Sequence, residues 1–290
     1  MDVPAGDIGV GSREIGFLFG AYRKLTRSFE GVFTGKSVAW GGSLLRPEAT
    51  GYGLVFFAAE AANKMRNSDL KGKKCIVSGS GNVALHCVEQ LLIQGAIPLT
   101  MSDSGGYVLE PNGFTKEQLK LMIQIKEKQR GRIQEYLKHS TTAQFFPNAK
   151  PWGYVDCDYA FPCATQNEID EKDAQGLVKS GCQGVFEGAN MPSTNEAIAV
   201  LKSNGVIFGP AKAANAGGVA VSGLEMAQNS MRINWTGKEV EDKLRDIMKS
   251  IFHKCSSTAE EYGRPGDLQF GANVAGFLKV AGAMRDQGVL

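Results

Sequence analysis

One short stretch of the sequence combines residue types that bind a pyrophosphate. Residues 74–84 have the pattern of a buried strand, a glycine turn and the first residues of a helix. In this pattern Gly79 permits the tight turn, Gly81 lets the backbone approach a pyrophosphate, and Ala84 replaces a third glycine where the helix packs on the strand. The N–H groups at a helix N-terminus also favour phosphate. The stretch therefore predicts a dinucleotide-binding turn.

The residue after the next apolar run bears on which dinucleotide binds. Asp103 follows residues 96–101, roughly 20 residues beyond the glycine turn, where a ribose-contacting residue belongs. An acidic side chain there usually bonds the ribose 2′-hydroxyl and repels a 2′-phosphate, which favours NAD. A basic run within residues 126–132 could instead meet a 2′-phosphate and favour NADP, or it could be a solvated helix end. These residues alone leave both cofactors open.

Other polar clusters lie where predicted strands end or predicted helices begin. They occupy residues 2–7, 46–51, 162–167, 187–192 and 212–218. In an open parallel sheet, ligands bind beyond the carboxyl ends of the strands. Small residues and amides there can hydrogen-bond a ribose or a carboxamide, although Asn and Thr at such turns also cap helices.

Strand and helix patterns alternate over the middle of the chain. Strands are predicted at 74–78, 97–101, 157–161, 184–187 and 205–208. Helices are predicted at 12–25, 51–65, 82–94, 116–128, 132–139, 170–179 and 194–202, and then at 219–231, 237–262 and 272–286. Capping boxes are predicted at Thr115 with Gln118 and at Ser193 with Glu196. The expected fold is α/β: a Rossmann-like, doubly wound, mostly parallel sheet followed by a C-terminal helical segment.

Composition narrows the class of protein further. The chain has 290 residues, enough for two lobes, and its net charge of +2 gives no reason to expect nucleic acid as a partner. No apolar run is long enough to span a membrane, and no signal peptide is evident. Six cysteines without a C-x-x-C pair indicate reduced core thiols and a cytoplasmic location. The three histidines lack metal-ligand spacing, so no metal site is predicted.

Taken in order, the motifs resemble glutamate dehydrogenases of the hexameric type, within the superfamily that also acts on leucine, phenylalanine and valine. The residues that carry the resemblance are 3–9, 41–43, 46–53, 79–84, 150–152, 162–167, 188–192, 212–218, 222–229 and 271–273. The run Ser102-Asp103-Ser104 is similar to the members that use NADP. The resemblance therefore implies NADP as the cofactor, with NAD less favoured.

The resemblance also implies residue roles. Asp7 would relay a proton to and from the substrate nitrogen, although an Asx-turn in a loop is the alternative from the residues alone. Ala5, Gly6, Val219 and Ser222 would line the substrate pocket, with the Ser222 hydroxyl on the distal carboxylate. The implied cofactor contacts are Thr50, Ser80, Gly81, Asn82, Val83, Asp103, Ala164, Thr165, Asn190 and Asn215.

The implied reaction is the oxidative deamination of L-glutamate to 2-oxoglutarate and ammonium by a homohexamer. Three parts are expected: a remnant of the substrate lobe at 1–42, a dinucleotide domain at 43–220, and helices at the hinge at 221–290. The family carries further substrate lysines in a lobe before the motif at residue 3, so we expect a C-terminal portion that is inactive alone. The alternatives are a leucine, valine or phenylalanine dehydrogenase, or a dinucleotide-binding module without turnover.

Overall fold

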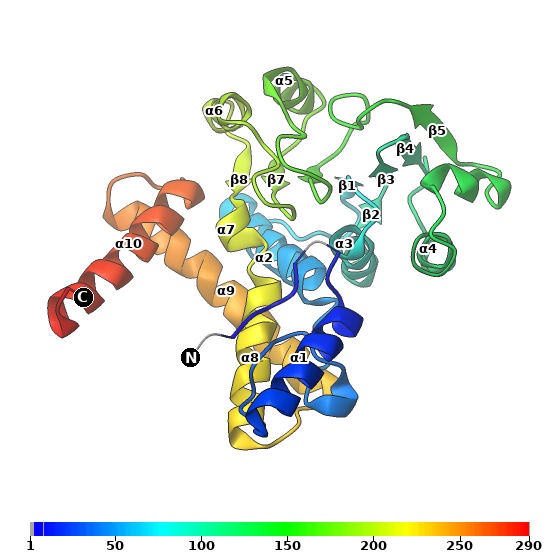
Figure 1. Cartoon of the computed structure of the whole chain (residues 1–290). Helices are drawn as coiled ribbons and strands as arrows, with labels where there is room; N and C mark the ends of the chain where they lie inside the picture. The colour runs from blue at the N-terminus through cyan, green and yellow to red at the C-terminus, as the bar shows by residue number, and fades with distance from the viewer. Residues whose placement is uncertain (1–2, 8, 290) are drawn as a thin grey trace.

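A five-stranded parallel sheet forms the centre of the molecule (Figure 1). The computed structural model describes residues 3–7 and 9–289. The strands, in their order across the sheet, are β2 (Ile97–Pro98), β1 (Lys74–Val77), β6 (Tyr159–Phe161), β7 (Gly184–Phe186) and β8 (Ile207–Gly209). The chain runs outward from β1 to β2 on one side and through β6, β7 and β8 on the other. The strand order therefore reverses between β1 and β6, which is where such sheets bind ligands.

Alternate residues of the strands face two separate cores. Ile76, Ala160 and Val185 pack with α5 (Glu171–Lys179) and α6 (Asn195–Ser203). Their strand neighbours, such as Val77, Phe161 and Phe186, pack with α2 (Ala49–Arg66), α3 (Asn82–Ile93) and α9 (Gly237–Glu261). Because successive side chains of a strand point to opposite faces, short apolar strands must be covered on both sides. This arrangement confirms the doubly wound fold that the sequence predicted.

A second, antiparallel sheet was not predicted from the sequence. It consists of β3 (Thr100–Asp103), β4 (Gly106–Leu109) and β5 (Gln144–Pro147), paired in that order. The predicted strand 97–101 is thus two strands, with β2 in the parallel sheet and β3 in the antiparallel one. Gly106, at φ +140°, allows the close pairing, because a Cβ there would lie 2.1 Å from the Phe146 carbonyl oxygen.

The helical predictions in this region also need correction. The predicted helix 116–128 is α4 (Lys116–Ile123), and its last part is a π-helical turn, Gln124–Lys128. The predicted helix 132–139 is a 3-10 helix, Ile133–Lys138. The Thr115 capping box is confirmed. The Ser193 box is wrong, because Thr194 caps α6 by accepting a hydrogen bond from Ala197 N, and the Ser193 N–H is turned toward Glu187 instead.

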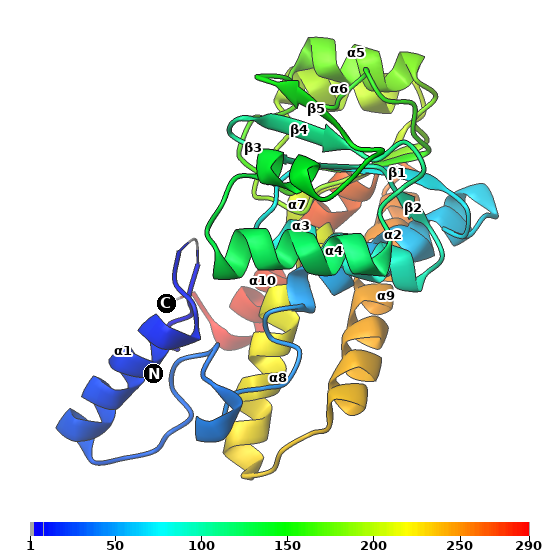
Figure 2. The same cartoon turned by 90° about the vertical axis from the view of Figure 1, so that its right-hand side faces the viewer.

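The remaining helices include those that extend furthest from the sheet (Figure 2). They are α1 (Ser12–Thr26), the 3-10 helix η1 (Val38–Trp40), α7 (Ala211–Ala214), α8 (Gly217–Met231) and α10 (Leu268–Gln287). α9 packs along α2, and α10 packs along α9. α8 packs against the segment 31–46, so the chain's beginning and its C-terminal helices meet below the sheet. The C-terminal helical segment that the sequence predicted is therefore present.

The cysteines lie in the core, as the sequence predicted: Cys75, Cys87, Cys157, Cys163, Cys182 and Cys255 are free and buried. Within residues 3–7 and 9–289, no helix combines the length and the apolar character needed to cross a membrane. In the same part of the chain, no three His, Cys, Asp or Glu side chains form a group that could hold a metal ion.

Candidate active site

The predicted glycine turn lies at the carboxyl end of β1, next to the point where the strand order reverses. Gly79 has φ +86°, and a Cβ there would lie 2.8 Å from the Cys163 carbonyl oxygen, so the position requires glycine. Gly81 is the N-cap of α3, and a Cβ built on it would meet nothing within 4 Å. The space over Gly81 and the start of α3 is therefore open to a phosphate.

The other predicted cofactor residues near this turn occupy two places. Ser80 is buried, whereas Asn82 and Val83 begin α3. The Asn82 side chain donates a hydrogen bond to the Pro47 carbonyl oxygen, which joins the start of α3 to the segment that begins α2. Thr50 lies in the first turn of α2, and its hydroxyl oxygen is 2.5 Å from where a Gly218 Cβ would be. Thr50 thus stands between the glycine turn and the start of α8.

The turns after β6, β7 and β8 meet at the same edge of the sheet. Asn215 Nδ2 donates to Asn190 Oδ1 at 3.0 Å, and it lies 3.4 Å from the Gly188 carbonyl oxygen. Asn167 N donates to the Met191 carbonyl oxygen at 2.9 Å, which ties the Ala164–Thr165 turn to the Asn190 loop. The structure therefore brings Asn190 and Asn215 into contact and joins their loop to the turn that carries Ala164 and Thr165, the other two residues that the resemblance sets around the nicotinamide.

A buried carboxylate, which the sequence reading did not single out, fixes two of these turns. Glu187 follows β7 and accepts hydrogen bonds from Ala211 N at 2.8 Å and Ser193 N at 3.2 Å. Burial raises the pKa of Glu187, while these hydrogen bonds and nearby Lys212 oppose the rise. Glu187 thereby links the loop that carries Asn190 to the helix that precedes Asn215.

The Asp103 carboxylate makes hydrogen bonds and ion pairs within the protein, and these bear on the choice of dinucleotide. Asp103 Oδ1 accepts from Gly105 N at 2.8 Å, and Oδ2 accepts from Ile133 N at 3.1 Å. The Lys126 ammonium lies 3.8 Å and the Arg132 guanidinium 4.0 Å from Oδ2. Arg132 also donates to Ser104 Oγ at 2.6 Å and is two-thirds exposed. The carboxylate charge is offset locally, and the exposed Arg132 guanidinium beside it is a group suited to binding phosphate.

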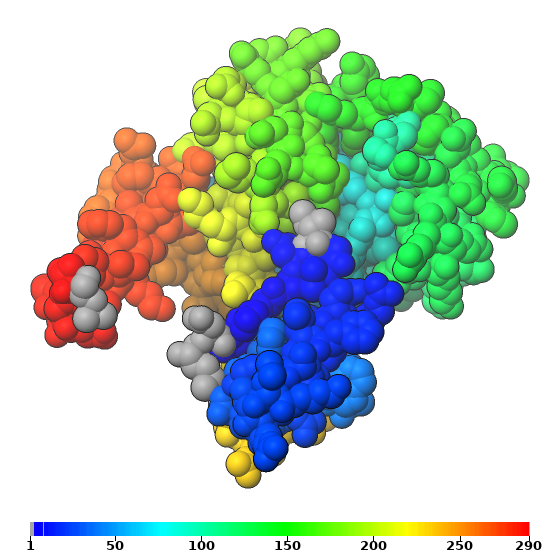
Figure 3. Space-filling view, viewed as in Figure 1, coloured from blue at the N-terminus to red at the C-terminus, as the bar shows by residue number. Residues whose placement is uncertain are grey.

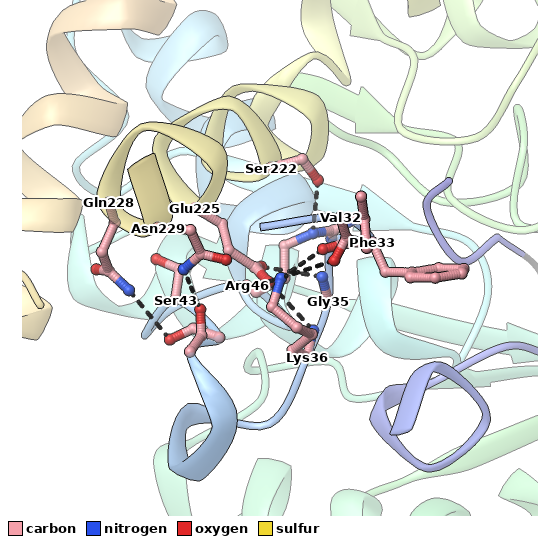
Figure 4. A network of polar contacts seen from close by, with 12 residues as sticks. Val32, Phe33, Gly35, Lys36, Ser43, Arg46, Ser222, Glu225, Gln228 and Asn229 are labelled. Carbon is pink, nitrogen blue, oxygen red and sulfur yellow. Dashed lines mark hydrogen bonds and ion pairs between the residues drawn. The ribbon is translucent and has the colours of Figure 1, made fainter. Parts of the chain in front are cut away.

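Two of the predicted substrate residues, Val219 and Ser222, lie on α8, next to a network of charged groups (Figure 4). Ser222 Oγ accepts a hydrogen bond from Arg46 Nε at 3.0 Å. One turn further, the completely buried Glu225 carboxylate lies 2.8 Å from the Lys36 ammonium and accepts hydrogen bonds from Gly35 N and Lys36 N. One turn before Ser222, Val219 is exposed. The stripe Val219, Ser222, Glu225 therefore runs from the surface into this network.

The charges of this network do not balance among themselves. It contains two cations, Lys36 and Arg46, and one carboxylate, Glu225. Burial lowers the pKa of Arg46, and the charge of Glu225 opposes that effect. Glu225 is paired with Lys36, so the partly buried Arg46 has no carboxylate of its own, and the arrangement favours an anionic group beside Arg46 and Ser222.

Asp7 lies in a loop that is anchored to the same network. Ala5 forms a parallel bridge with Thr34, and Thr34 N donates to the Pro4 carbonyl oxygen at 3.0 Å. Gly6 allows the turn, because a Cβ there would lie 2.6 Å from the Val10 carbonyl oxygen. The Asp7 carbonyl oxygen accepts from Val10 N at 2.8 Å, so this turn is closed by backbone, and the Asp7 side chain is exposed. Asp2 and Ile8, which belong to the predicted motifs, lie outside the described residues.

Sequence reasoning gave no role to four residues that the structure places in this site. Arg46 stood within a recognised motif, and its contact with Ser222 spans 176 positions of the chain. Glu225 lies within the motif 222–229 and follows Ser222 at helical spacing, and both signals could have indicated it. Glu187 begins the polar cluster 187–192, but nothing in that cluster indicated its bond to Ala211 N. Lys36 carried no local pattern, because its partner Glu225 comes from a distant segment.

Comparison with known proteins agrees with these features. The model of the Glutamate/Leucine/Phenylalanine/Valine dehydrogenase family matches residues 41–288. The NADP-specific glutamate dehydrogenase of Chlorella sorokiniana is 58% identical over 100% of this chain and 55% of its own length. The enzyme of the same name from Giardia intestinalis is 53% identical over 99% of this chain and 64% of its own length.

Solved structures agree as well. The glutamate dehydrogenase of Plasmodium falciparum has a TM-score of 0.97 at 58% identity, over 100% of this chain and 62% of that one. This chain thus spans less than two thirds of the relatives that it matches. Nevertheless, the family match covers most of its length, and the chain belongs to the Glutamate/Leucine/Phenylalanine/Valine dehydrogenase family.

Proposed function

We propose that this chain forms the dinucleotide site and one wall of the substrate site of an NADP-dependent glutamate dehydrogenase. The reaction would convert L-glutamate, water and NADP⁺ to 2-oxoglutarate, ammonium, NADPH and a proton. The observation that carries the proposal is the position of Gly218 at the start of α8. A Cβ there would lie 2.5 Å from the Thr50 hydroxyl and 3.6 Å from Arg46 Nη1, so the proposed cofactor and carboxylate sites adjoin.

The residues present fit a bound dinucleotide. The open space over Gly81 would receive the pyrophosphate, and Ala164, Thr165, Asn190 and Asn215 would surround the nicotinamide and its ribose. Arg132 and Lys126, next to Asp103, support NADP over NAD. When bound, NADP⁺ supplies the hydride acceptor, and the protein supplies orientation and proton transfer.

On the substrate side, we assign binding to α8 and proton transfer to the N-terminal loop. Arg46 and Ser222 would hold the distal carboxylate of glutamate, with Val219, Ala5 and Gly6 along the pocket wall. Asp7 would take a proton from the substrate nitrogen and return it. An exposed carboxylate on a loop of small residues can approach a bound substrate closely, which suits this role.

The assembly and location of the protein are part of the same proposal. Large apolar side chains are exposed on α1, including Phe17 and Leu25, and on α10, including Phe277 and Val280. Figure 3 shows α10 projecting from the body of the molecule. We propose that these faces are covered in a homohexamer, with 1–42 and 221–290 serving the substrate lobe and hinge and 43–220 the cofactor. Buried free cysteines support a reducing, cytoplasmic setting.

The test is a steady-state assay of an active enzyme that contains this chain. We expect NADPH formation that depends on glutamate and is weak with leucine, valine or phenylalanine, because these side chains offer no carboxylate to Arg46. Asp7→Asn keeps the shape of the side chain but cannot transfer a proton, so it should lower kcat by at least about a hundredfold and spare NADPH affinity. A change in KM alone would assign Asp7 to binding and contradict the proposed role.

A further inference from the structure

The carboxylate of Glu168 holds the turn that follows β6. Glu168 Oε1 accepts hydrogen bonds from the backbone N–H groups of Ala164, at 3.0 Å, and Thr165, at 3.3 Å. Ala164 and Thr165 are exposed, whereas Glu168 is partly buried beneath them. The same carboxylate oxygen therefore fixes the backbone of two residues that the proposed function sets beside the nicotinamide.

Glu168 also adjoins the glycine turn. Cys163 N donates to Ser78 Oγ at 2.9 Å, and the Ser78 hydroxyl stabilises the charged form of the neighbouring Glu168. Ser78 directly precedes Gly79, whose added Cβ would lie 2.8 Å from the Cys163 carbonyl oxygen. The two turns are thus in contact, and Glu168 with Ser78 lies at their junction.

The Glu168 carboxyl group has a pKa near neutral pH. Burial raises its pKa to about 7, although Ser78, the two backbone N–H groups and the charge of Lys150 all lower it. Lys150 is the charged side chain that faces Glu168 from the preceding segment, and it is itself paired with Asp173 of α5 at 2.8 Å. A small change of pH can therefore change the charge of the group that holds the turn.

We infer that Glu168 is a positioning residue for the dinucleotide, whose carboxylate sets the Ala164–Thr165 backbone in the geometry that receives the nicotinamide end. The inference rests on the proposed binding of NADP. Hydrogen bonds to an ionised acceptor are roughly twice as strong as those between neutral groups, so the carboxylate holds the turn more firmly than the protonated acid does. Dinucleotide affinity should then rise as Glu168 loses its proton.

The test measures dinucleotide affinity of this chain by calorimetry at about pH 6 and about pH 8. NADH is the main probe, because it lacks the 2′-phosphate that itself titrates, and NADPH is the second. We expect the wild type to bind NADH about fivefold more tightly at the higher pH, and Glu168→Gln to show no such rise. Glu171→Gln, an exposed carboxylate three residues further, is the matched control and should follow the wild type.

A measurement on the wild type alone covers the case in which Glu168→Gln does not fold. NADH binding near pH 7, compared in two buffers of different ionisation enthalpy, should release protons, and near pH 9 it should release none. Parallel pH curves for wild type and Glu168→Gln, or no proton release near pH 7, would overturn the inference while leaving cofactor binding intact. Absence of binding to either dinucleotide at both pH values would instead defeat the proposed function, and the inference with it.

Discussion

Arg46 Nε lies 3.0 Å from Ser222 Oγ, and this contact determines which way the Ser222 hydroxyl can point. The guanidinium can only donate, so the Ser222 oxygen is the acceptor and its own hydrogen is free for another partner. A carboxylate is a suitable partner, because it accepts from the hydroxyl and is attracted by the neighbouring guanidinium. This geometry supports the proposed role of the pair in binding the distal carboxylate of the substrate.

Removal of the Ser222 hydroxyl should affect binding more than turnover. In an active enzyme that contains this chain, Ser222→Ala should raise KM for glutamate by about tenfold or more, since a hydrogen bond to a charged group is lost. kcat should change little, because the distal carboxylate is the same in the ground and transition states. Norvaline, which lacks that carboxylate, is the control substrate, and an equal rise in its KM would contradict the assignment.

Loss of the Glu225 charge should be among the most damaging single changes. Both side chains of the Lys36–Glu225 pair are completely buried, so Glu225→Gln leaves an uncompensated ammonium in the interior. We expect the free energy of unfolding to fall by about 3–5 kcal/mol in chemical denaturation. The double variant Lys36→Met with Glu225→Gln should recover much of this loss. If both variants lose the same stability, the pair has no special coupling.

For Gln90 we predict a substitution that raises the free energy of unfolding. Its side chain is completely buried on α3, and within the described residues neither its amide nitrogen nor its oxygen has a hydrogen-bond partner. Gln90→Met, which keeps the volume, should therefore raise the free energy of unfolding by about 1–2 kcal/mol. Gln175→Met, at an exposed position of α5, is the control and should change little. Destabilisation by Gln90→Met would mean that the amide is satisfied by bound water.

The pKa of Glu168 predicts how stability depends on pH. Its folded-state pKa of about 7 lies above the ordinary value of 4.5, so between these values the folded chain binds more protons than the unfolded chain. By linkage, the contribution of Glu168 to stability is present below about pH 4.5 and is lost as pH rises through about 7. As pH rises across this range, the free energy of unfolding of the wild type should fall relative to that of Glu168→Gln by up to about 3 kcal/mol, which denaturation of both proteins measures. A constant difference would contradict the raised pKa.

The sequence was sufficient for features whose signal is local. The glycine turn, the strands of the parallel sheet and the long C-terminal helices each depend on a pattern within a short window. The antiparallel sheet was not found, because β4 and β5 are four residues each and pair across 34 intervening positions of irregular chain and short helices. The Ser193 cap was misplaced by one residue because Ser is a stronger N-cap residue than Thr, whereas in the structure Ser193 N bonds Glu187 and Thr194 takes the cap.

In the candidate site, too, some residues could be predicted from the sequence and others could not. Residues within motifs, such as Gly81 and Asn215, could be named from the sequence. The effect of Asp103 could not be judged, because its neutralisation depends on Lys126 and Arg132 folding back onto it from the segment after α4. Glu225 holds backbone from a segment 190 positions away, which no local pattern reports. Glu168 bonds backbone N–H groups only three and four positions before it, but its role depends on the burial that the fold creates around it.

The most direct test of the whole account is a calorimetric titration of this chain with NADPH and with NADH. We predict that the wild type binds NADPH more tightly than NADH, and that Gly81→Val abolishes binding because its side chain fills the space over the start of α3. Gly276→Val, where an added Cβ likewise meets nothing within 4 Å but on α10, should bind as the wild type does. Equal NADPH affinity of wild type and Gly81→Val, or tighter binding of NADH than of NADPH, would contradict the account.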